Sequence, residues 1–496
     1  MLKRFALLAI LLFTASAAQA DWYRAESPNF VLYMDGSQAD IRELIERLER
    51  LDNFLGRVSG THSEPPLVKM HVFAVSSARH VQSLHGGGDR DVGGYYRADE
   101  RGPYAVIPER GVGRRRFGQS AEGILYHEYA HHFLLYYSPS VYPAWYQEGF
   151  AEFYSSIEFE GENRIAVGKP VNNRAPALQL GRWIPVEAIL SGSEVPSDML
   201  YAQAWLITHY TVFNSDAREQ LRAYLQALRD GDTAADAYRA TFGATGIDYD
   251  DVLRDYMNNP LRALMLTVEP PAASEITIER LSDERGETAL LSIRHDEDGL
   301  EEARELLEDY PENPQILAEL ARLQIENEEF DAALGTAEQA LAIDPDHVDG
   351  NLYKGLALLA AAREADDPDD PRWEEGRGFV ARANRADPAN ALALFSYATS
   401  AHRENPRPEM ANEALEAAFA RVPQSSSVRA TYALWLAHEG DYRAAMRVLS
   451  PLVEAPHGAE GDSGLRGLLR EWRERAEGEE DDETDIADEA PNSDEN

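Results

Sequence analysis

The residues of this chain best suited to chemistry are two histidines and a glutamate in the run HEYAHH at positions 127–132. Apolar residues precede and follow the run, and the pattern is compatible with a helix. In a helix, residues four positions apart lie one turn apart on the same face, so His127 and His131 can direct two imidazoles at one point. Glu128 would lie beside them without competing as a ligand. Two histidine ligands and a neighbouring glutamate base are what zinc-dependent hydrolysis requires.

A catalytic zinc also needs a third protein ligand, and a second segment offers one. Pro143 can begin another helix, and the turn at 138–140 lets that helix fold back on the first. Glu148 would then face the two histidines and complete the site. Glu152, one turn later, is either a competing third ligand or the partner that orients a ligand histidine. The other interpretation of the pattern is a buried helix that carries two satisfied histidines.

The sequence HEYAH, followed after sixteen residues by Glu148 in WYQEGFAEFY, resembles the gluzincin metallopeptidases of the peptidase-MA-like branch. The resemblance implies that His127, His131 and Glu148 bind Zn²⁺ and that Glu128 is the general base. It also implies hydrolysis of peptide bonds in a protein or peptide substrate. Aminopeptidases of this group carry a Gly-x-Met-Glu-Asn strand that grips a free amine. That strand is missing here, so an endopeptidase is expected rather than an aminopeptidase.

The same resemblance implies a tyrosine opposite the metal, whose hydroxyl stabilises the oxyanion. Apolar spacing predicts an amphipathic helix over residues 200–213. Tyr201, at the start of this helix, is the candidate catalytic tyrosine, and Tyr210 and His209 are the alternatives. A purely packing role for Tyr201 remains a second interpretation.

The first part of the chain mixes strand and helix patterns. Strands are predicted at 29–34, 67–75 and 104–107, and a helix at 41–58. The pattern is of the α+β type, and the resemblance to gluzincins implies a zincin-like catalytic domain over residues 21–269. In such a domain an edge strand near the metal pairs with extended substrate, and we expect the strand at 104–107 to lie there because it directly precedes the metal helix.

Beyond a proline-rich linker at 270–280, the pattern changes to repeats. Residues 314–347 form one 34-residue unit of the tetratricopeptide type, and related units follow. An all-α solenoid of four or five helix pairs is therefore predicted over 281–475, with a concave face for an extended protein partner. The final segment, 476–496, is strongly acidic and is predicted to be a disordered tail.

The first twenty residues have the pattern of a cleavable export signal. A basic end and a short apolar core precede small residues, which predict cleavage after Ala20. No later segment is apolar enough to span a bilayer, and the chain has no cysteine. We therefore expect a periplasmic or secreted product. The net charge of −40 argues against nucleic acid and anionic membranes as partners.

Two alternatives to an exported peptidase with a recruiting solenoid remain. One is a periplasmic tetratricopeptide scaffold or assembly factor whose zinc site is vestigial or structural. The intact Glu128 argues against it, because a structural site needs no base. The other is a peptidase-chaperone that takes its third ligand from a later helix. The sequence around Glu148 disfavours that arrangement.

Overall fold

The computed structural model describes residues 22–61, 64–86, 92–109, 120–137, 140–161, 163–170, 173–193, 196–269, 275–401, 404, 407–453 and 463–488. The predicted export signal at 1–20 lies outside these residues. Within them, no helix is both long and apolar enough to cross a membrane.

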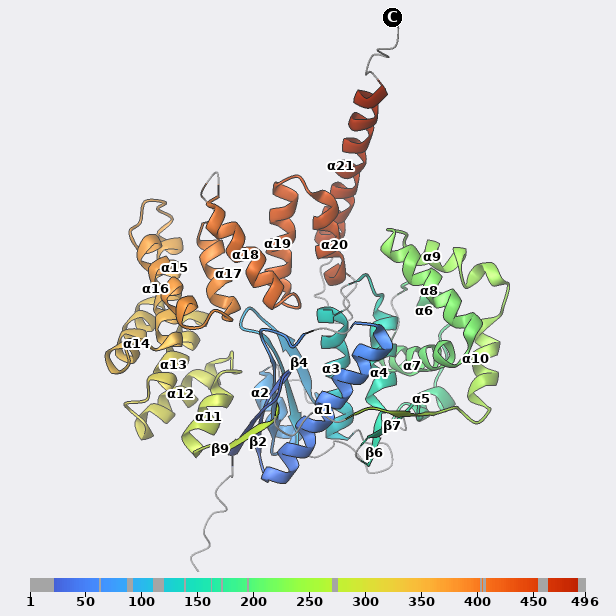
Figure 1. The fold of residues 1–496 in the computed structure, drawn as a ribbon, viewed down its shortest axis with the longest axis horizontal. Helices are drawn as coiled ribbons and strands as arrows, with labels where there is room; N and C mark the ends of the chain where they lie inside the picture. Colours follow the sequence, from blue (N-terminus) through green and yellow to red (C-terminus); the bar gives the residue numbers. More distant parts are fainter. Residues whose placement is uncertain are drawn as a thin grey trace, which may run out of the picture.

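A six-stranded mixed sheet forms the centre of the molecule (Figure 1), in the order β4-β5-β3-β2-β1-β9. The neighbours β2, β3 and β5 run parallel, whereas β4, β1 and β9 pair antiparallel. The parallel strands are largely buried, as expected when both faces of a sheet are covered. The strands are β1 (Trp22–Glu26), β2 (Phe30–Asp35), β3 (Met70–Val75), β4 (Tyr95–Ala98), β5 (Pro103–Pro108) and β9 (Thr277–Arg280).

Different helices cover the two faces of this sheet. Helix α1 (Gln38–Ser59) begins at the N-cap Ser37 and ends at Gly60, whose φ of 70° suits glycine. Its apolar stripe packs on one face together with α3 (Ala121–Tyr137). The other face is covered by α2 (Ala78–His85) and by residues of α11 (Asp283–Leu291), the first helix of the repeats. The repeats are thus packed directly against the sheet.

A second lobe packs against α3 through α4 (Ala144–Ser155). Gly149 of α4 lies so close to α7 that an added Cβ would come within 2.6 Å of the Ala204 carbonyl oxygen, so a larger residue would push the two helices apart. The lobe contains α5 (Ala175–Leu180), α6 (Val186–Leu190), α7 (Ser197–Phe213), α8 (Ser215–Arg229), α9 (Ala234–Ala240), η1 (Gly243–Thr245) and α10 (Tyr249–Met257), with a small sheet of β6 (Glu158–Glu160), β7 (Arg164–Val167) and β8 (Leu264–Thr267).

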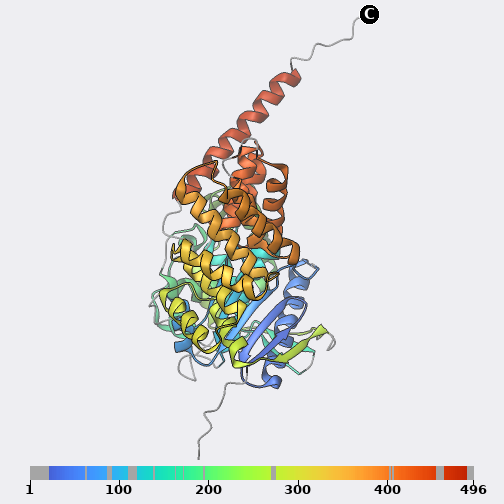
Figure 2. The same ribbon diagram turned by 90° about the vertical axis from the view of Figure 1, so that its left-hand side faces the viewer.

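The C-terminal region forms successive helix pairs that arc around the sheet (Figures 1 and 2). Small residues allow close contact within a pair: Gly355 of α15 and Gly376 of α16 meet backbone to backbone. The predicted unit at 314–347 corresponds to α13 and α14. The remaining helices are α12 (Glu297–Asp309), α13 (Pro314–Glu326), α14 (Phe330–Ile343), α15 (Val348–Ala365), α16 (Arg372–Ala386), α17 (Ala391–Ser400), α18 (Glu409–Arg421), α19 (Ser426–His438), α20 (Tyr442–Val453) and α21 (Ser463–Asp488).

The structure corrects three sequence predictions. The stretch predicted as a linker, 270–280, includes β9, which pairs with β1 at the edge of the sheet. The strand predicted at 104–107 is β5, and it is not an edge, because β3 and β4 flank it. The predicted disordered tail at 476–496 begins inside α21, which runs to Asp488. The first two errors share a cause, since β4 and β9 are each only four residues long, too short for an alternating apolar pattern to mark them as strands. In addition, β9 pairs with β1, at the other end of the first region.

Candidate metal centre

Helix α3 presents the two predicted histidine ligands. His127 and His131 are both buried, at 8% and 7% exposure. Their Nε2 atoms lie 3.2 Å apart. The one-turn spacing therefore brings the two imidazoles to a common point, as predicted from the sequence.

Glu148 reaches the same point from α4. This helix begins directly after Pro143, and its packing on α3 turns Glu148 inward at 1% exposure. Its Oε2 atom lies 3.4 Å from Nε2 of His127 and 3.6 Å from Nε2 of His131. One donor atom from each of the three residues lies within 4.8 Å of the others. The three predicted ligands are therefore brought together.

These distances fit a zinc ion. Tetrahedral zinc with bonds of about 2.0–2.1 Å holds its ligand atoms about 3.3 Å apart. The observed separations of 3.2, 3.4 and 3.6 Å match that spacing with the side chains as they stand. Two imidazoles and a carboxylate are also a donor set that zinc accepts in catalytic sites.

The charges at this point favour a cation. Burial alone would lower the pKa of His127, but its contact with Glu148 and the charges of Glu152, Glu148 and Glu128 raise the pKa to about 9. Burial alone would raise the pKa of Glu148, but the charge of His131 and the contacts with both histidines hold that pKa well below its usual range. The protein thus stabilises positive charge between the three side chains.

Glu152 lies behind His127, on the side of the ring away from the ligand group. Its Oε1 atom lies 3.5 Å from Nδ1 of His127, on the ring side opposite Nε2. The same oxygen accepts a 2.6 Å hydrogen bond from Nη2 of Arg174. Glu152 is fully buried and does not join the ligand group of the described residues. It is placed to orient His127, as carboxylates commonly do behind ligand histidines.

Glu128, the predicted base, follows His127 on α3 and is half-buried. Its charge acts on His127, on Tyr96 of β4 and on Tyr201 of α7, where it raises the pKa in each case after the effect of burial. Glu128 is therefore within electrostatic reach of both β4 and α7, and it is not a member of the ligand group among the described residues.

Tyr201 lies close to the centre, and its two rivals do not. Its ring centroid is 6.1 Å from that of His127, and the guanidinium of Arg174 lies 4.7 Å above the Tyr201 ring. Burial and the charge of Glu148 raise the pKa of Tyr201, so its hydroxyl stays protonated. His209 instead contacts the Tyr256 hydroxyl at 2.8 Å, and Tyr210 packs against the same α10 side chain.

Sequence reasoning missed two residues that support the site. The Tyr96 hydroxyl lies 3.0 Å from Nδ1 of His132, the residue after the second ligand. Arg174 joins Glu152 to Tyr201, as described above. Tyr96 follows a glycine-rich stretch that reads as loop, and Arg174 precedes a six-residue helix. Neither residue belongs to a motif, so no local signal marked them.

Comparison with known proteins identifies the second region. A family model for the tetratricopeptide repeat matches residues 297–359. The C-terminal region contains tetratricopeptide repeats. The match does not reach the metal centre, and no curated protein matched the chain.

Solved structures give a similar result. TTC0263, a thermophilic TPR protein in Thermus thermophilus, is 19% identical, with 39% of this chain and 98% of that chain covered and a TM-score of 0.32. MamA from Desulfovibrio magneticus RS-1 is 16% identical, with 36% of this chain and 99% of that chain covered and a TM-score of 0.27. YrrB, a TPR protein with an unusual peptide-binding site, is 15% identical, with 35% of this chain and 84% of that chain covered and a TM-score of 0.25. All three TM-scores lie below 0.5, so nothing about this chain is inferred from these structures.

Proposed function

We propose that the protein is a zinc-dependent peptidase of the gluzincin type, with a zincin-like first domain and with repeats that bind a protein. The observation that carries the proposal is the convergence of His127, His131 and Glu148 on one buried point, with Glu128 beside them. Zinc held there would polarise a carbonyl group and make a water molecule more acidic. A purely structural site would have no use for the neighbouring carboxylate.

The side chains of the protein supply the proton transfers. Glu128 takes a proton from the attacking water as the water oxygen bonds to the peptide carbonyl carbon. It then gives that proton to the leaving nitrogen as the carbon–nitrogen bond breaks. Tyr201, protonated and close to His127, donates a hydrogen bond to the carbonyl oxygen as negative charge develops there.

Strand β4 is suited to hold the substrate. Among the described strands it pairs only with β5, so its other edge has backbone groups available to an extended peptide. Helix α3 contacts β4 and carries two of the three candidate ligands, His127 and His131. An extended chain along β4 would therefore pass the ligand group, which supports an endopeptidase rather than an enzyme that grips a free amine.

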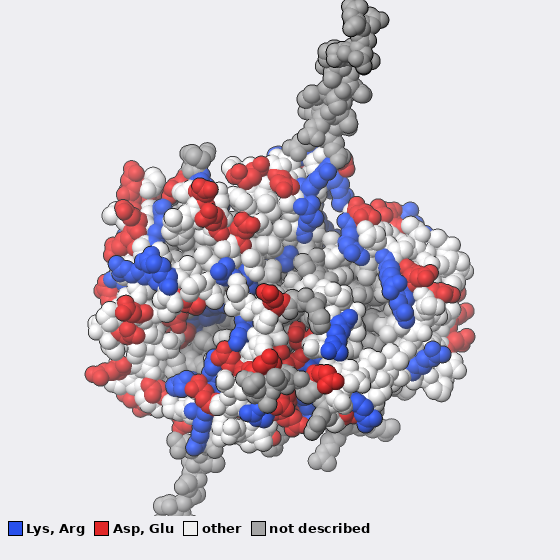
Figure 3. All heavy atoms as spheres, viewed as in Figure 1, with Lys and Arg blue, Asp and Glu red and all other residues white. Residues whose placement is uncertain are grey.

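We expect a protein partner because tetratricopeptide repeats form extended binding surfaces. Acidic side chains are spread over the visible face with basic ones among them (Figure 3), and the net charge is −40. Such a charge repels nucleic acid. The export signal predicted at 1–20 would place this activity in a periplasm or outside the cell.

Replacement of Glu128 by Gln tests the proposal. The amide keeps the shape of the side chain but cannot accept a proton, so zinc content should stay unchanged while hydrolysis of an unfolded protein falls roughly 10²–10⁴-fold. Glu122→Gln is the matched control, because Glu122 lies on α3 but pairs with Arg47 of α1.

Cleavage that persists undiminished in the Glu128 variant would exclude the assigned base. A wild-type protein that holds zinc but cleaves no unfolded substrate would favour the scaffold with a structural zinc site.

A further inference from the structure

The turn between β4 and β5 connects the edge strand to the repeats. Asp99 closes this turn, because its Oδ1 accepts from the backbone N–H of Arg101 at 2.8 Å and of Gly102 at 3.3 Å. Its Oδ2 accepts from Nη2 of Arg101 at 2.7 Å. The turn is therefore fixed by its own side chains, and the Arg101 guanidinium is held at a set angle.

Arg101 reaches from this turn to the first repeat. Its Nη1 donates a 2.6 Å hydrogen bond to the carbonyl oxygen of Ser292, which follows α11. Its Nη2 lies 3.2 Å from Nε2 of His295, and the Tyr104 hydroxyl of β5 lies at the same distance from that nitrogen. The Arg101 guanidinium thus contacts both the Ser292 carbonyl group and the His295 imidazole of the repeats. The Tyr104 hydroxyl contacts the same imidazole.

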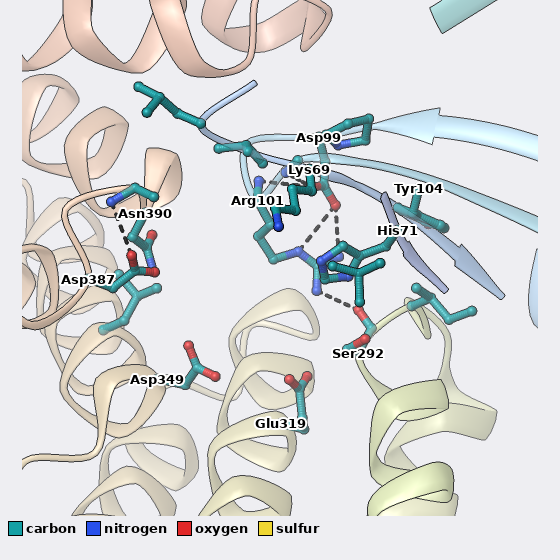
Figure 4. A pocket seen from close by; sticks show the side chains of 18 of the residues that line it. Lys69, His71, Asp99, Arg101, Tyr104, Ser292, Glu319, Asp349, Asp387 and Asn390 are labelled. Atoms are coloured by element: carbon teal, nitrogen blue, oxygen red, sulfur yellow. Dashed lines mark hydrogen bonds and ion pairs between the residues drawn. The ribbon is translucent and has the colours of Figure 1, made fainter. Parts of the chain in front are cut away.

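The contact continues into the repeats. Nδ1 of His295 lies 3.3 Å from a carboxylate oxygen of Glu326 in α13, and Glu326 accepts a 2.8 Å hydrogen bond from Arg322. Figure 4 shows Arg101 on one side of a cavity of about 460 Å³, with Glu319 and Asp349 of the repeats on the opposite side. The positive charge of Arg101 is therefore balanced first by Asp99 in its own turn and then by Glu319 on the repeats.

The β4 side of the hairpin packs against α3, the metal helix, which carries His127 and His131. Gly94, next to β4, lies so close to Ile124 of α3 that an added Cβ would be 2.4 Å from its Cγ2. Tyr96 contacts His132, the neighbour of the ligand His131. Movement of the turn would therefore be transmitted along a four-residue strand to the metal helix.

A second arginine connects the repeats to the end of that helix. Arg429 of α19 is 1% exposed and donates to the carbonyl oxygens of Pro423 at 2.7 Å and Val448 at 3.0 Å. Its Nη2 lies 3.5 Å from the carbonyl oxygen of Leu135, in the last turn of α3. A cation at the C-terminal end of a helix is electrostatically favourable. The repeats thus contact the turn that follows β4 and also the C-terminal end of α3.

We propose that Arg101 is a positioning residue through which the repeats hold β4 against the metal helix. The repeats are then a brace for the substrate-binding edge and not only a module that recruits a partner. The inference rests on the proposed peptidase function for its catalytic consequence, but the positioning of β4 can be measured without it.

The experiment compares full-length wild type with Arg101→Gln and His295→Ala, which break the same contact from its two sides. Arg285→Gln is the matched control, because Arg285 pairs with Glu279 of β9 at an exposed junction between the sheet and the repeats. Amide hydrogen exchange in 95–98 should speed up in both contact variants, while zinc content and exchange in the middle of α3 stay unchanged. The control should match the wild type throughout.

Kinetics add a second measurement. For an extended peptide long enough to pair with β4, kcat/KM should fall roughly tenfold in the contact variants, because a displaced edge strand misplaces the scissile bond. For a dipeptide amide too short to pair with β4, the rate should stay near that of the wild type. Arg101→Lys keeps the charge but not the fork of donors, and it should recover only part of the loss.

The outcomes separate the two proposals. Unchanged exchange in 95–98 in both contact variants overturns the positioning role. Faster exchange there together with a wild type that cleaves nothing removes the peptidase proposal alone. An equal loss on both substrates, with zinc lost as well, means general unfolding and also overturns the positioning role.

Discussion

The candidate metal centre is built from buried charged groups and the junction between sheet and repeats from partly exposed ones, and the two draw on very different parts of the chain. Two helices that follow each other in sequence supply all three candidate metal ligands. The junction joins Arg101 to Ser292 and His295, which belong to another region altogether. A site of the first kind can be read from a motif. A site of the second kind exists only after the fold has formed.

If the metal centre is as self-contained as this comparison implies, losing the metal should leave the junction intact. His131→Ala should reduce the zinc content from about one ion per chain to almost none after dialysis, since two ligands remain of three. Hydrogen exchange around residues 99–102 should not change.

His132→Gln is the control for that variant, because His132 contacts Tyr96 rather than the ligand group. Retention of full zinc by the His131 variant would disprove the assigned site. Loosening of the junction on metal loss would show that the two regions are coupled more strongly than their separate origins suggest.

Replacement of Tyr201 shows whether α7 contributes a catalytic group in addition to the residues on α3 and α4. Tyr201→Phe removes a hydroxyl on α7 and keeps the ring that packs near His127 and Arg174. We expect kcat to fall roughly 10²-fold with KM and zinc content little changed, because the lost hydrogen bond serves the transition state. A variant with wild-type kcat would leave Tyr201 only its packing role.

Replacement of Glu152 should have a smaller effect, which is seen in the affinity for zinc. Glu152→Gln weakens the contact with Nδ1 of His127 and the ion pair with Arg174. Zinc affinity, measured by competition with a chelator, should fall roughly 10- to 100-fold. Loss of all zinc would instead make Glu152 a ligand, and unchanged affinity would exclude its orienting role.

The last prediction concerns overall stability and the hydrogen bond between α1 and α3. The Tyr129 hydroxyl donates a 2.5 Å hydrogen bond to Asp52, and burial raises the pKa of Asp52 to about 6. The folded protein therefore binds a proton that the unfolded chain releases near pH 4. This carboxyl group makes stability fall as pH rises from about 4 to about 6, by at most about 3 kcal/mol. Chemical denaturation across this range should show that slope, and Asp52→Asn should remove it.

Much of the metal centre was predictable because a helix fixes the directions of side chains four residues apart. His127 and His131 needed only that rule, and Glu148 needed one further helix that begins after Pro143. The sequence could not choose between Tyr201, Tyr210 and His209, because all three lie on α7. The choice depends on which face of α7 packs on α4, and a close approach at Gly149 sets that packing.

The repeats were recognisable for a similar reason, since each unit is encoded within its own 34 residues or so. The sheet was not fully predictable. The strands β4 and β9 are each four residues long, too short for an alternating apolar pattern to reveal them, and the partner of β9 is the sequence-distant β1. The sequence therefore predicts no strand at 95–98 or 277–280, and without β4 the strand at 104–107 is expected at the edge.

The pairing of β9 with β1 also has a consequence for the order in which the protein is made. Tyr23 leaves the ribosome early, yet its partner Arg280 follows only after the whole first domain. Until then one side of β1 presents unpaired backbone groups, which can attach to strands of other nascent chains. Rapid synthesis of the segment up to residue 280, or a holding chaperone, would shorten this exposure. Aggregation during expression should therefore be worst for chains that stop before β9.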